Sequence, residues 1–198
     1  CHSVRSNGMA PVEVEGRLRG GKVSIECKTS QYLSSLLAAT PLADSDTEID
    51  VTLLNEPDYV RMTLDWLDGQ GIRYESKGLK WFRVFGGQSY KAFERAIPAD
   101  FSSATFFLCA AALLGCELTL EGLDFTDSQP DKAVAGYLGQ MGAKVSIDGT
   151  TVRIKGGSLN GIEIDMNKTP DALPAMAVTA AFADGVTRFV NVPQARMK

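Results

Sequence analysis

Histidine is nearly absent from this sequence, and its few cysteines are not arranged as metal ligands. The 198 residues include one histidine, His2, and four cysteines, none of which forms a C-x-x-C pair. Tetrahedral zinc sites draw their ligands from closely spaced Cys and His residues, so we expect no such cluster. We expect the cysteines to be reduced and mostly buried in a cytoplasmic protein, and we assign no role to His2 in what reads as a frayed terminus.

Long apolar runs and a strong excess of one charge are also absent. No run approaches the roughly 20 apolar residues of a membrane span, and the first residues are polar, unlike a signal peptide. The formal net charge of -4 argues against a general nucleic-acid binder, although a local basic pocket for a small anion is compatible with it. Hydrophobic content of 44% and charged content of 22% are those of a soluble globular protein with one large domain or two small ones.

The predicted elements recur in the same order, as strand, polar turn and helix. The helix starts at Ser30, Ser103 and Asp171 are separated by 73 and 68 residues. Strands are expected at 12–18, 22–27, 48–53, 73–75, 81–85, 95–97, 117–121, 142–145, 151–155, 162–166 and 187–192. Helices are expected to begin near 30, 57, 101, 130 and 171. Usual solenoid units are shorter, about 20 to 50 residues, so the period predicts an α/β (α+β) fold of repeated βαβαββ units.

Helical spacing also predicts what each helix buries. In the helix that ends at Gly115, the apolar stripe is expected to bury Phe106, Phe107, Ala110, Leu113 and Leu114. Taken alone, Asp171 after Pro170 is an ordinary helix N-cap, favoured by the exposed N–H groups. Because each unit sends its first helix from the same strand end, three such helix starts converge, and convergence favours an anion site over a simple cap.

Several motifs identify a family that this chain resembles. They are Thr-Ser-Gln-Tyr-Leu-Ser-Ser-Leu-Leu at 29–37, Ala-Thr-Pro-Leu-Ala at 39–43, Gly-Gly-Gln-Ser-Tyr at 86–90, Asp-Phe-Ser-Ser-Ala at 100–104, Met-Gly-Ala at 141–143, Ile-Asp-Met-Asn-Lys-Thr-Pro-Asp at 164–171, Ala-Phe-Ala-Asp-Gly at 181–185 and Arg-Met-Lys at 196–198. In this order they closely resemble the 5-enolpyruvylshikimate-3-phosphate synthases, also called 3-phosphoshikimate 1-carboxyvinyltransferases.

The resemblance implies a two-lobed fold in which each lobe holds three βαβαββ units and the active site lies in the cleft between them. This chain then corresponds to an internal section: residues 1–90 to the later part of the first lobe, 91–99 to a crossing segment, and 100–198 to the first part of the second lobe. The implied reaction transfers the enolpyruvyl group of phosphoenolpyruvate to the 5-hydroxyl of shikimate 3-phosphate by addition and elimination. No metal or organic cofactor, nucleic acid or membrane is implied.

The resemblance also implies site residues. Thr29 and Ser30 match the pair that holds the substrate phosphate, and Gln31 matches the residue that touches both substrates. Asp171 matches the acid at the reacting hydroxyl, a candidate general base. The weaker matches are a substrate-facing tyrosine, an Asn position and a phosphate-binding lysine, here Tyr59, Gln194 and Lys198. The family's Ser before the tyrosine is replaced, since this sequence reads Glu-Pro-Asp-Tyr at 56–59.

Parts of the family pattern have no counterpart in these residues, among them most of the phosphoenolpyruvate clamp and one proton-transfer acid. We therefore expect the 198 residues alone to have little or no transferase activity and, with uncovered sheet edges and helix faces, to self-associate, whereas a full-length family member is expected to be a monomer. Two alternatives stay open: the related transferase acting on UDP-N-acetylglucosamine, and a non-catalytic repeat scaffold that binds anions.

Overall fold

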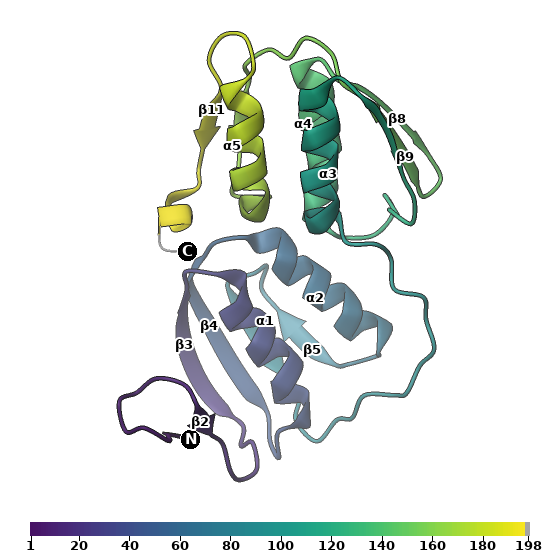
Figure 1. Ribbon diagram of the computed structural model, residues 1–198. Helices are drawn as coiled ribbons and strands as arrows, with labels where there is room; N and C mark the ends of the chain where they lie inside the picture. Colours follow the sequence, from purple (N-terminus) through teal and green to yellow (C-terminus); the bar gives the residue numbers. More distant parts are fainter. Residues whose placement is uncertain (197–198) are drawn as a thin grey trace.

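The first half of the chain is a mixed sheet with two helices packed side by side against it (Figure 1). The computed structural model describes residues 1–196. The sheet has the order β3-β4-β6-β5, with β3 parallel to β4 and both other pairings antiparallel. Its elements are β3 (Gly21–Cys27), α1 (Ser30–Ala39), η1 (Thr40–Leu42), β4 (Thr47–Leu54), α2 (Pro57–Gly69), β5 (Tyr74–Ser76) and β6 (Trp81–Val84).

The second half repeats the arrangement with a second core. The strand order β7-β9-β8, with both pairings antiparallel, is that of β4, β6 and β5 in the first half. Its elements are α3 (Phe101–Leu114), β7 (Glu117–Leu120), η2 (Pro130–Lys132), α4 (Ala133–Met141), β8 (Lys144–Asp148) and β9 (Thr151–Lys155). The buried apolar side chains accordingly form two separate clusters, one in each half.

A third unit begins beside α3. Here β10 (Glu163–Asp165) pairs in parallel with β11 (Arg188–Val190), as β3 pairs with β4. Between these strands lie η3 (Pro170–Ala172) and α5 (Leu173–Ala181), and a last turn, η4 (Pro193–Arg196), follows β11. In Figure 1, α3 and α5 stand side by side with their N-terminal ends toward the first half, and α1 and α2 begin on the facing side of that half. The predicted α/β fold of repeated units is confirmed.

Four local predictions were wrong. The strand predicted at 12–18 is only β2 (Val12–Glu13), which pairs with β1 (His2–Ser3). Residues 95–97 form no strand. Phe106, Phe107 and Leu114 are 56%, 60% and 78% exposed, and Ala110 is exposed as well. The reason is that α3 is apolar nearly all round, and its buried side carries Phe101, Leu108 and Ala112 instead. The cysteines are free, but only Cys27 and Cys109 of the four are buried.

The segment between the halves is held by single hydrogen bonds rather than by a strand ladder. Tyr90 donates its hydroxyl to the carbonyl of Ala38 at 2.6 Å, and the side chain of Gln70 accepts from the N–H of Lys91 at 2.8 Å. At the far end Ala99 N–H donates to the carbonyl of Gly122 at 2.9 Å. Along the described chain, no helix is long and apolar enough to cross a membrane.

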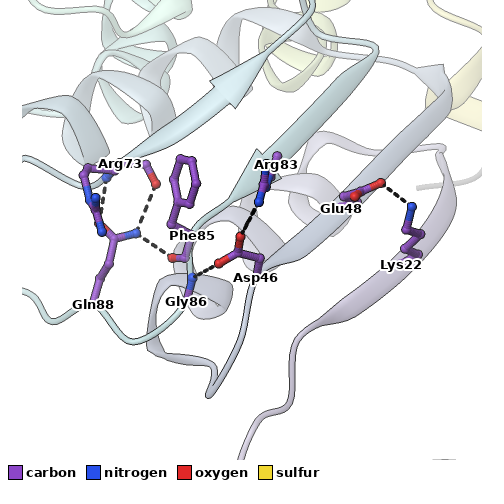
Figure 2. A network of polar contacts seen from close by, with 8 residues as sticks. All are labelled: Lys22, Asp46, Glu48, Arg73, Arg83, Phe85, Gly86 and Gln88. Carbon is purple, nitrogen blue, oxygen red and sulfur yellow. Dashed lines mark hydrogen bonds and ion pairs between the residues drawn. The ribbon is translucent and has the colours of Figure 1, made fainter.

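Asp46 ties the end of β6 to the turn before β4. Its carboxylate accepts from Arg83 Nη2 at 2.9 Å and from the N–H of Gly86 at 3.2 Å, as Figure 2 shows. The N–H bond of Gly86 and then the Arg83 guanidinium hold the pKa of Asp46 below its ordinary value. In the same view the side chain of Gln88 forms hydrogen bonds with the backbone of Arg73 and of Phe85, so it also links the residue before β5 to the residue after β6.

This contact predicts acid sensitivity. Because the pKa of Asp46 is lower in the folded than in the unfolded chain, its ionised form stabilises the fold above the unfolded value of about 4, and this contribution disappears as pH falls through the folded pKa. We expect Asp46→Asn to be less stable than wild type at neutral pH, with the gap narrowing below about pH 4 in urea titrations. The exposed Asp50 of β4 is the control, and a gap independent of pH after Asp46→Asn would contradict the assignment.

Candidate active site

The first helix start is built from Thr29, Ser30 and Gln31. Thr29 has extended backbone angles and caps α1, its hydroxyl oxygen accepting from the N–H of Gln31 at 3.1 Å. Ser30 is 4% exposed, and Gln31 is exposed. A run of polar residues at the end of β3 thus places two hydroxyl groups at the N-terminus of a helix, an end whose N–H groups and dipole favour negative charge.

Asp171 lies in η3, immediately before α5, and its side chain is exposed. The N-cap residues of η3 and α5 are Thr169 and Ala172, so the interpretation of Asp171 as the N-cap residue is wrong. Asp100, by contrast, caps α3. Its carboxylate accepts hydrogen bonds from the N–H groups of Ser102 and Ser103, each at 3.0 Å.

Tyr59 of α2 joins the two halves. Its hydroxyl donates to Asp131 Oδ2 of η2 at 2.6 Å, and Asp131 is only 3% exposed. Burial, then the hydrogen bond to Asp131, and then the charges of Asp131, Asp171 and Glu56 raise the pKa of Tyr59 far above its ordinary value. The phenol stays protonated at neutral pH and acts only as a hydrogen-bond donor or acceptor, not as a base.

Two adjoining hollows surround these residues and share Tyr59, Met62 and Asp171. The first, of about 250 Å³, is lined by Ser30, Gln31, Ser34, Glu56, Tyr59, Met62, Thr63 and Asp171. The second, of about 260 Å³, is lined by Tyr59, Met62, Trp66, Ile97, Pro98, Asp100, Ser102, Asp127, Gln129, Pro130, Asp131 and Asp171. The starts of α1, α3 and α5 thus meet at one cleft between the halves, with Asp171 common to both hollows.

The cleft is acidic. Glu56, Asp100, Asp127, Asp131 and Asp171 all line it, and none of the lining residues within the described part of the chain is a lysine or arginine. Over residues 1–196, no group of His, Cys, Asp and Glu is arranged to hold a metal ion. Hydroxyl, amide and helix N–H groups are therefore the anion donors that the described residues supply, and a carboxylate is the kind of group that serves as a general base.

The structure brings together five of the predicted site residues, and it does not test the other two. Ser30, Gln31, Tyr59 and Asp171 line the first hollow, and Thr29 precedes it at the start of α1. Gln194 falls in η4, but its side chain lies outside the described residues, and so does the whole of Lys198. The roles given to all seven residues stay predictions.

Sequence reasoning did not predict three further residues of the cleft. Glu56 is 2% exposed and accepts from Ser30, Asp131 bonds Tyr59, and Asn167 Oδ1 accepts from the N–H of Glu56 at 3.3 Å. Pro130-Asp131 repeats the Pro-Asp pair of 170–171, and that signal points to Asp131. No pattern points to Asn167, whose contact with Glu56 spans 111 residues.

Known proteins resemble this chain in sequence and in fold. The chain is 57% identical over 196 residues to the 3-phosphoshikimate 1-carboxyvinyltransferase of Acetivibrio thermocellus and 55% identical over 196 residues to that of Ruminiclostridium cellulolyticum, covering 99% of this chain and 46% of each relative. The solved structure of the EPSP synthase from Acinetobacter baumannii superimposes with a TM-score of 0.71 at 26% identity, over 100% of this chain and 46% of that one.

The chain spans about half the length of the curated relatives that it matches. The sequence profile described as EPSP synthase (3-phosphoshikimate 1-carboxyvinyltransferase) matches residues 1–198. The chain therefore belongs to the EPSP synthase family.

Proposed function

We propose that this chain forms the shikimate 3-phosphate-facing part of an enzyme that transfers the enolpyruvyl group of phosphoenolpyruvate to the 5-hydroxyl of shikimate 3-phosphate. The observation that carries the proposal is that Ser30, Gln31, Tyr59 and Asp171, from elements far apart in sequence, line one hollow. The names of the relatives from Acetivibrio thermocellus and Ruminiclostridium cellulolyticum support the same reaction.

In the proposed reaction the 5-hydroxyl oxygen bonds to C2 of phosphoenolpyruvate, the hydroxyl loses its proton to a base, and the methylene carbon gains a proton. The tetrahedral intermediate then loses phosphate from C2 and a proton from the methyl carbon, which restores the double bond. Asp171 is the base in this proposal, because it is an exposed carboxylate that lines both hollows.

The other roles follow from position. Thr29 and Ser30 offer hydroxyl and N–H groups to the substrate phosphate, and Gln31 is exposed to contact both substrates. Tyr59 donates its proton to Asp131 and so presents its hydroxyl oxygen to the substrate as an acceptor, and Gln194 and Lys198 complete the binding set. Residues 91–99 are the crossing segment between two lobes. The enzyme acts in the cytoplasm. Self-association of the chain stays a prediction, motivated by exposed apolar side chains on α3 and directly after α5, such as Phe107, Leu114 and Phe182.

Calorimetric titration tests the proposal directly. We expect the chain to bind shikimate 3-phosphate, and Gln31→Ala to weaken that binding roughly 5- to 10-fold, the effect of one lost hydrogen bond. Gln140→Ala on exposed α4 is the matched control and should leave the affinity unchanged. No binding of shikimate 3-phosphate at millimolar concentration, or an equal effect of the two substitutions, would contradict the proposal.

A further inference from the structure

Glu56 is a buried carboxylate held by an unusual backbone conformation. It precedes α2 with φ 60° and ψ 49°, which is the left-handed region that residues other than glycine seldom adopt. Glu56 as a whole is only 2% exposed. Its N–H donates to Asn167 Oδ1 of the other half at 3.3 Å. Conformation and contact together direct the carboxylate inward, toward the start of α1.

That carboxylate uses the donors that a bound anion would use. Glu56 Oε2 accepts from the N–H of Ser30 at 3.1 Å and from Ser30 Oγ at 2.9 Å. Ser30 is itself 4% exposed and begins a ten-residue helix. An N–H group and a hydroxyl group at a helix N-terminus are the usual ligands of a phosphate oxygen, and here a side chain of the protein takes them both.

A ligand anion cannot share the N–H and hydroxyl groups of Ser30 with the Glu56 carboxylate without electrostatic repulsion. Two like charges a few ångströms apart repel strongly at a partly buried site, and Asp171 adds a further negative charge to the same hollow. A ligand phosphate can therefore reach Ser30 only if the Glu56 carboxylate moves away from it.

We propose that Glu56 is an internal anion that competes with ligand phosphate for Ser30 and so determines how tightly this site takes a phosphorylated ligand. The identity of the ligand as shikimate 3-phosphate rests on the proposed function, whereas the competition for Ser30 does not. Glu56 is thus a specificity-determining residue: it disfavours phosphate at α1 and leaves the part of the ligand beyond the phosphate unaffected.

The experiment compares wild type, Glu56→Ser and Glu56→Gln by calorimetry with inorganic phosphate, shikimate 3-phosphate and unphosphorylated shikimate. Glu56→Ser is expected to bind inorganic phosphate and shikimate 3-phosphate about tenfold more tightly or better, with the affinity for shikimate unchanged. Glu56→Gln keeps an oxygen acceptor for Ser30 without the charge, so its gain is smaller. Glu75→Ser removes the same charge from exposed β5 and should change nothing.

An independent signal comes from the backbone amide of Ser30 in nitrogen-15 NMR spectra. Phosphate should shift this resonance in Glu56→Ser at concentrations that leave wild type unchanged. Equal or weaker binding of inorganic phosphate by both Glu56 variants, with folded spectra, would overturn the proposal. If shikimate 3-phosphate and shikimate bind to no variant while the gain for inorganic phosphate persists, the competition holds and the proposed function fails. Should Glu56→Ser not fold, Glu56→Gln alone decides by the same readouts.

Discussion

Replacing Asp171 by asparagine is expected to lower turnover roughly 100- to 10,000-fold, the usual contribution of a general base. Asparagine keeps the shape of the side chain and its hydrogen-bonding capacity but cannot take a proton from the 5-hydroxyl. Because Asp171 is exposed and caps neither η3 nor α5, its loss should leave the fold intact. The affinity for shikimate 3-phosphate should change only a few-fold, so the effect falls on kcat.

The measurement is phosphate release from phosphoenolpyruvate and shikimate 3-phosphate, in a polypeptide of the relatives' full length that contains these residues. Asp148→Asn, on the exposed β8–β9 hairpin of the same half, is the control and should retain wild-type turnover. Turnover within threefold of wild type after Asp171→Asn would remove Asp171 as the base. A protein without turnover in any form, yet with phosphate binding, would favour the anion-binding scaffold instead.

The repeat and most of its elements were predictable because they depend on neighbouring residues. Alternating apolar residues predicted β4, and Thr29 before an apolar stripe predicted α1. The repeat then predicted that the starts of α1, α3 and α5 meet at one cleft. That prediction is confirmed by the two hollows that share Asp171.

What the sequence did not predict depends on contacts between distant residues. Glu56 reads as a surface residue before a helix, yet it is buried because it bonds Ser30, 26 residues earlier. Asp131 pairs with Tyr59 across 72 residues. Helical spacing also failed for α3, because a helix that is apolar nearly all round does not show which face is buried, and Phe106 and Phe107 are exposed.

Alanine at Gly20 is expected to lower the free energy of unfolding by about 3 kcal/mol, whereas alanine at the adjacent Gly21 should change it by less than about 0.5 kcal/mol. A Cβ atom on Gly20 would lie 2.2 Å from the carbonyl oxygen of Ser45, while one on Gly21 meets nothing within 4 Å. The Ser45 backbone cannot yield easily. Its turn is fixed by hydrogen bonds from Asp44 N–H to the carbonyl of Leu18 at 3.2 Å and from Gly87 N–H to the carbonyl of Ala43 at 2.7 Å.

Gly86 approaches the same carbonyl group, since its Cβ would lie 2.4 Å from the Ser45 oxygen. Gly86→Ala should therefore lower the free energy of unfolding about as much as Gly20→Ala does. In the double variant the loss should be smaller than the sum of the two single losses, because the first substitution already displaces Ser45 and relieves part of the second clash. Urea unfolding of both single variants, the double variant and Gly21→Ala measures this coupling. Additivity within about 0.5 kcal/mol would mean that the two glycines act independently and that Ser45 is not their common obstacle.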